Sequence, residues 1–115
     1  MADDAYDVLV DLLDAGAPAE VVLRSEGPFD RFVGVADADD ALARLDRVLQ
    51  RVVDDVSRSF GDPRFFGGPD AQGYPRWSGA ARVAVWALDD DDLSPWVAVV
   101  RDGPDGTIDL KAGVR

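Results

Sequence analysis

The sequence predicts a single α+β domain spanning residues 1–115: a mostly antiparallel sheet of about five strands, packed against one long amphipathic helix and a short N-terminal helix. Residues 42–60 carry apolar side chains at steps of three and four, as one face of a helix does. Residues 82–101 hold two runs rich in Val and Trp on either side of an acidic turn, which is typical of a β-hairpin. A length of 115 residues fits one domain. The predicted element order is α-β-β-α-β-β-β.

The first helix is predicted to begin after Asp3 or Asp4 and to run to about Ala15, where Gly16 and then a proline end it. A short strand over residues 20–25 follows, because three consecutive apolar residues lie there. The triplet Glu26-Gly27-Pro28 is a turn signal, so residues 29–35 are predicted to return as the second strand of a hairpin.

The long helix is predicted to start at Asp37 or Asp39 and to end at Phe60, because Gly61 and Pro63 stop it. Its apolar stripe is expected to be the centre of the core. The stripe consists of Leu42, Leu45, Val48, Leu49, Val52, Val53, Val56 and Phe60.

Residues 62–79 are rich in Gly, Pro and aromatic residues, and they are predicted to form a long ordered loop. The strand that begins at Arg82 has apolar side chains on both faces, so it is expected to be covered on both sides at the middle of the sheet. The second strand of this hairpin reaches Arg101. Residues 107–111 alternate between apolar and polar, which favours an outer strand with one solvated face.

The composition excludes several chemistries. The chain has 23 acidic and 12 basic residues, a net charge of −11, and neither His nor Cys. Zinc sites, cysteine nucleophiles and histidine acid–base catalysis are therefore ruled out. Catalysis would have to rest on carboxylates, arginine, tyrosine or the single lysine. We expect no enzyme activity, no cofactor and no metal. The negative charge disfavours direct binding to nucleic acid or an anionic membrane and favours a basic protein partner, although solubility alone also accounts for it. Without a membrane-length apolar run, a secretory signal or cysteines, the protein is expected in the cytoplasm.

Two segments are candidates for binding that partner. The acidic turn Asp89, Asp90, Asp91 and Asp92 could present charge to it, or could be a solvated hairpin loop. Contiguous carboxylates point in different directions, which argues against a calcium site. The loop contributes the second group, which could form a recognition surface or could close one end of the core. This group consists of Phe65, Phe66, Tyr74, Arg76 and Trp77.

Residues 42–101 resemble small actinobacterial immunity-like proteins of polymorphic toxin systems. The resemblance rests on an amphipathic helix that ends at Phe60-Gly61-Asp62-Pro63, then a variable loop leading to Arg76-Trp77, and then strands. It implies an immunity or inhibitor protein that occludes a cognate toxin. The net charge of −11 suits a basic nuclease as that toxin, and a DNA mimic is a close variant, because regularly spaced Asp side chains can stand in for phosphates. The alternatives are a small-ligand or regulatory domain with loop 62–79 as its lid, and an assembly protein that forms homo-oligomers. The sequence specifies neither the partner nor the oligomeric state.

Overall fold

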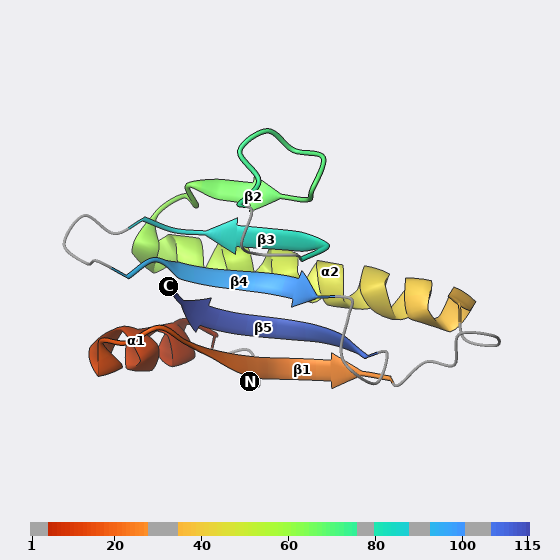
Figure 1. The fold of residues 1–115 in the computed structure, drawn as a ribbon, viewed down its shortest axis with the longest axis horizontal. Coiled ribbons are helices and arrows are strands. Elements are labelled where there is room, and N and C mark those ends of the chain that lie inside the picture. The colour runs from red at the N-terminus through yellow and green to blue at the C-terminus, as the bar shows by residue number, and fades with distance from the viewer. Residues whose placement is uncertain (1–4, 28–34, 76–79, 88–92, 101–106) are drawn as a thin grey trace.

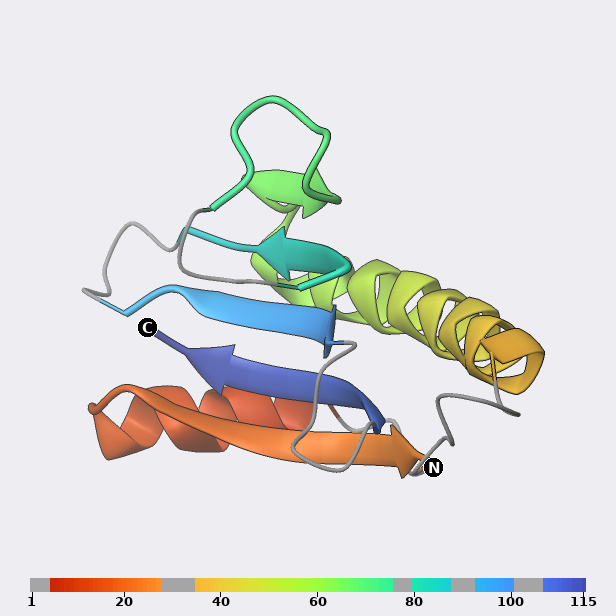
Figure 2. The same ribbon diagram turned by 45° about the vertical axis from the view of Figure 1, so that its right-hand side comes forward.

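Five strands form one antiparallel sheet in the computed structural model, and two helices pack on one of its faces (Figure 1, Figure 2). The structure describes residues 5–27, 35–75, 80–87, 93–100 and 107–115. The elements are α1 (Ala5–Ala15), β1 (Ala19–Glu26), α2 (Val35–Phe60), β2 (Phe65–Gly67), β3 (Arg82–Val85), β4 (Pro95–Val100) and β5 (Ile108–Val114). The strands lie in the order β1-β5-β4-β3-β2, and each neighbouring pair is antiparallel.

The helix α1 turns its apolar side toward the sheet, where Ala5 and Leu9 are buried. The helix ends at Ala15 because Gly16 adopts a positive φ of 72°, a conformation that glycine adopts without a steric penalty. The Gly16 amide donates a hydrogen bond of 3.1 Å back to the carbonyl of Leu13, which closes the last turn.

The 26-residue helix α2 buries one side along most of its described length. Burial of each large apolar side chain contributes about 1.5–3 kcal/mol before the entropy of ordering is subtracted. Gly61, at a φ of 82°, ends the helix and donates a 2.9 Å hydrogen bond to the carbonyl of Ser57. The buried positions lie at steps of one, three and four, and they are Ala41, Leu45, Leu49, Val52, Val53 and Val56.

The main core lies between these helices and one face of the sheet. Trp86, which follows β3, is its largest fully buried side chain, and its indole N–H donates a 3.0 Å hydrogen bond to the Gly61 carbonyl. Phe60 meets Trp86 edge-on with ring centroids 6.5 Å apart, and Tyr6 lies 5.3 Å from Phe60. This row of three rings joins α1, the end of α2 and the segment after β3.

The predicted class is confirmed: the fold is α+β, with a five-stranded antiparallel sheet and two helices. The predicted element order is not confirmed. Val35, expected to end a strand, is the first residue of α2, and the rest of that predicted strand lies outside the described residues. Residues 65–67, expected to lie in a loop, form β2 at the edge of the sheet, because their amides and carbonyls pair with β3.

The position predicted for the last strand was also wrong. Its alternating pattern favoured an outer strand, but β5 lies inside the sheet, between β1 and β4. The alternation arises because one face of β5 packs on the helices, while Asp109 and Lys111 lie on the less covered face. None of the helices in the described ranges combines the length and the apolar character that a membrane crossing requires.

Candidate functional site

The strand register divides the sheet into two faces with different surroundings. Directly opposed residues share a face, so Ala84, Val97 and Ala112 lie together on the face that packs on the helices. The other face, called here the open face, bears no helix from the described part of the chain (Figure 2). Its described residues come from all five strands: Phe65, Gly67, Val83, Val85, Trp96, Ala98, Val100, Asp109, Lys111, Gly113, Glu20, Val22 and Ser25.

The side chain of Trp96 is the centre of the open face. It is only 7% exposed although no described helix covers it, because its ring lies against Gly113 on the neighbouring strand. A Cβ atom added to Gly113 would stand 2.5 Å from Trp96 Cζ2 and 2.7 Å from the carbonyl oxygen of Ala19. Glycine at this position therefore lets the indole lie flat on the sheet, where a side chain would lift it away.

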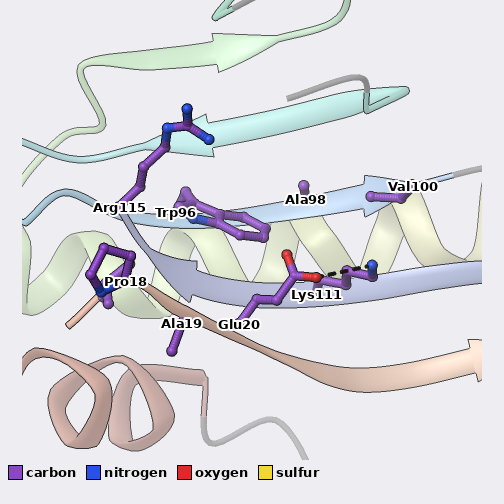
Figure 3. Close-up of a pocket in the computed structure, with 9 residues that line it drawn as sticks. Pro18, Ala19, Glu20, Trp96, Ala98, Val100, Lys111 and Arg115 are labelled. Carbon is purple, nitrogen blue, oxygen red and sulfur yellow. Dashed lines mark hydrogen bonds and ion pairs between the residues drawn. The ribbon is translucent and has the colours of Figure 1, made fainter. Parts of the chain in front are cut away.

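A hollow of about 320 Å³ opens beside this ring (Figure 3). Ala98 and Val100 of β4 continue its apolar wall beyond Trp96. Glu20 and Lys111 come from the two neighbouring strands, and their charged groups are 3.4 Å apart. The hollow thus combines an apolar floor with an ion pair at its rim, a combination common in binding surfaces.

A second hollow of about 350 Å³ lies on the same face, toward the edge strand β2. Phe65, Val85 and Pro75 line it, together with the polar residues Arg64 and Ser94. Arg115 lines both hollows, and its main chain is held by two hydrogen bonds with Ser94, of 2.7 and 3.0 Å. The open face therefore offers two neighbouring depressions bordered by one arginine.

The loop aromatics that the sequence singled out lie on different faces. Tyr74 donates a 2.7 Å hydrogen bond to the Ala80 carbonyl and meets Phe65 edge-on at 6.1 Å, so both close the β2 side of the open face. Phe66, the next residue of β2, points to the opposite face, where the Arg82 guanidinium lies 4.5 Å from its ring centre. All three rings are half-buried.

The remaining predicted binding residues lie outside the described residues. These are Arg76, Trp77, Asp89, Asp90, Asp91 and Asp92. Sequence reasoning missed the open-face hollow, and above all Trp96 and Gly113. A signal was present: the large ring of Trp96 is opposed by a strand that contains Ala112 and Gly113, and small residues in a strand indicate close approach of another group.

The described residues hold no group of three or more His, Cys, Asp or Glu side chains able to bind a metal ion. The described open face contributes an apolar floor, an ion pair and one hydroxyl from Ser25, which donates a 2.6 Å hydrogen bond to Asp109.

Comparison with known proteins places the chain in no group. No family model, no curated protein and no solved structure matches it.

Proposed function

We propose that this protein is a non-enzymatic acidic binding protein, an immunity or inhibitor protein that occludes a basic protein partner, such as a nuclease toxin, in the cytoplasm. One observation carries the proposal: in a chain of net charge −11, the open face of the sheet is not covered by any described helix. This face contains the hollow beside Trp96, which is lined by both apolar and charged residues. Apolar surface with a charged rim is the usual composition of a protein interface.

Charge supports a basic partner rather than an acidic one. The exposed side of α1 carries Asp7, Asp11 and Asp14 at steps of four and three, and the helix contains no basic residue. These carboxylates form no ion pair with a described residue. Such an exposed row of like charges increases the rate at which an oppositely charged protein arrives.

The open face supplies contacts that would hold the partner after it arrives. Val22 on β1 is 49% exposed and lies in the same cross-strand row as Lys111 and Ala98. An apolar side chain of the partner could enter the hollow beside Trp96. Basic side chains of the partner around that contact would then meet Glu20. Aromatic pockets of this kind commonly supply most of the affinity of an interface.

A DNA-mimic inhibitor is the close variant of this function. The three aspartates of α1 lie in one line on a rigid helix, so they can stand in for the phosphates that a nuclease binds. The two variants differ in which surface makes the contact, since a mimic binds through α1 and an occluding inhibitor binds through the open face.

Two adjacent valines of β1 give a matched test. Val21 and Val22 are 41% and 49% exposed but lie on opposite faces of the sheet, so the same change to arginine adds the same charge to each face. Against a basic partner copurified from the native host, Val22→Arg should raise the dissociation rate at least tenfold, about 1.4 kcal/mol. Val21→Arg should leave that rate within about twofold of wild type.

The third variant, Asp7→Asn with Asp11→Asn and Asp14→Asn, should lower the association rate, and added salt should abolish the difference. Surface-plasmon kinetics measure both rates. If only this variant weakens binding, and does so through dissociation, the protein is a mimic that binds through α1. An acidic partner, or equal effects of the two valine changes, would refute the occluding role of the open face.

A further inference from the structure

A cleft of about 520 Å³ lies between the end of β1 and α2. Arg24 of β1 lines it, and α2 contributes Arg44, Arg47 and Arg51. Its floor is apolar, formed by Leu45, which is buried, and Val48, which is half-buried. Four arginines around one cleft are unexpected in a chain with nearly twice as many acidic as basic residues.

The geometry of α2 brings three of these cations together. Arg44, Arg47 and Arg51 are separated by steps of three and four, so they lie on one side of the helix and repel one another. Among the described residues that line the cleft, Glu26 carries a carboxylate, and it pairs with Arg44 at 2.8 Å. Arg47 and Arg51 form no ion pair with any residue that the structure describes.

The carboxylates nearest to these two arginines along α2 have other partners. Asp46 receives two hydrogen bonds of 2.8 Å from Arg82. Asp54 accepts a 3.3 Å hydrogen bond from Gln50. Asp55, four residues after Arg51, pairs instead with Arg58 at 3.5 Å. Arg47 and Arg51 therefore leave positive charge in the cleft, because these three aspartates are engaged by other residues.

We propose that this cleft binds a small molecule that bears two or more phosphate groups. Guanidinium groups bind phosphate oxygens through paired N–H donors, and Arg47 and Arg51 have such donors available at the cleft. The volume of about 520 Å³ lies in the range of small-ligand sites. The bound ligand would connect β1 to α2.

The surrounding charge selects against larger polyanions. A nucleic acid extends over many phosphates, so the acidic residues outside the cleft would repel it in a chain of net charge −11. A compact ligand contacts only the cleft. Two linked phosphates also concentrate several negative charges within a few ångströms. The carboxylates of an acidic peptide are spaced further apart, and they match the close group of arginines less well.

The test is calorimetric titration of the intact protein with inorganic pyrophosphate at low ionic strength. The variant Arg47→Gln with Arg51→Gln should weaken binding about tenfold or more, since each loses charged hydrogen bonds to the ligand. The matched control is Ser59→Asp with Gln72→Glu, which makes the net charge more negative by the same two units at exposed residues outside the cleft. Its affinity should remain within about twofold of wild type. All four side chains are exposed, so both variants should melt as wild type does.

Amide chemical shifts then locate the site: the largest changes on titration should fall in residues 24–26 and 44–51. The proposal is overturned if pyrophosphate does not bind at millimolar concentration, if the control variant loses as much affinity as the cleft variant, or if the shifts lie elsewhere. Binding of an aspartate-rich peptide without binding of pyrophosphate would also overturn it, because the cleft would then serve an acidic protein segment.

Discussion

Replacing Gly113 with alanine tests the arrangement of the open face directly. The added methyl group would stand 2.5 Å from Trp96 Cζ2, 2.7 Å from Trp96 Cε2 and 2.7 Å from the Ala19 carbonyl oxygen. Carbon atoms pack best at about 3.5–4.0 Å, so the indole must retreat by about 1 Å. The same methyl group pushes on β1, whose residue Glu20 is paired with Gly113.

Overpacking of this kind costs typically 1–3 kcal/mol, and because two neighbours must move we expect about 2 kcal/mol. For a domain of this size, that loss lowers the melting temperature by roughly 8 °C. Thermal unfolding followed by circular dichroism measures the shift. Tryptophan fluorescence should move to longer wavelength, because the lifted ring of Trp96 gains contact with water.

Measuring Gly113→Ala in a second protein background separates the clash with the Trp96 ring from the clash with strand β1. In a Trp96→Leu protein, the alanine at position 113 should cost less than half as much, because the larger of its two clashes is gone. The reasoning is refuted if Gly113→Ala melts within about 1 °C of wild type, or if its cost is the same in both backgrounds.

Two further changes test the packing of α2. Leu49→Asp should unfold the protein, because position 49 is 0% exposed and would bury an unpaired charge; a cooperative melting transition at the wild-type temperature would show that the side chain is not in the core. Arg82→Ala should lower the free energy of unfolding by about 1 kcal/mol, through loss of the half-exposed ion pair with Asp46 and of the contact with Phe66. Urea denaturation at low and high salt separates these two contributions, because salt weakens the ion pair more than the contact with the ring. If the variant is as stable as wild type at both salt concentrations, neither the ion pair nor the ring contact contributes to stability.

The spacing of apolar residues along the sequence was sufficient to predict the fold class, because the clearest patterns lie in the helix and strands that form the core. Leu45, Leu49 and Val56 stand at helical spacing, and all are buried. The two-sided apolar run from Val83 to Trp86 predicted a strand covered on both faces at the middle of the sheet. These four residues are buried, but β3 lies next to the edge strand β2 and not at the middle. In both cases the residues that form the pattern are the residues that lose contact with water.

Features that depend on distant partners could not be predicted in the same way. β2 has only three residues among Gly and Pro, and pairing with β3 rather than its own pattern makes it a strand. The alternation in β5 records which face is covered and carries no information about which strands lie beside it. The two hollows and the arginine cleft each combine segments far apart in the sequence, so no single stretch indicated them.

The place of β5 in the sheet affects how the protein can be made. β1 is among the first described elements to leave the ribosome, yet its described partner β5 is the last, and the paired residues Ala19 and Val114 are almost a full chain apart. β5 also joins β4 to β1, so until it emerges the sheet exists only as a β2-β3-β4 meander and a separate strand. Closing such a long loop late is slow. Synthesis therefore exposes the β4 edge and the apolar residues of β1 until β5 inserts between them. A chain truncated before Ile108 would gain two unsatisfied edges prone to aggregation, those of β4 and β1 that β5 normally covers.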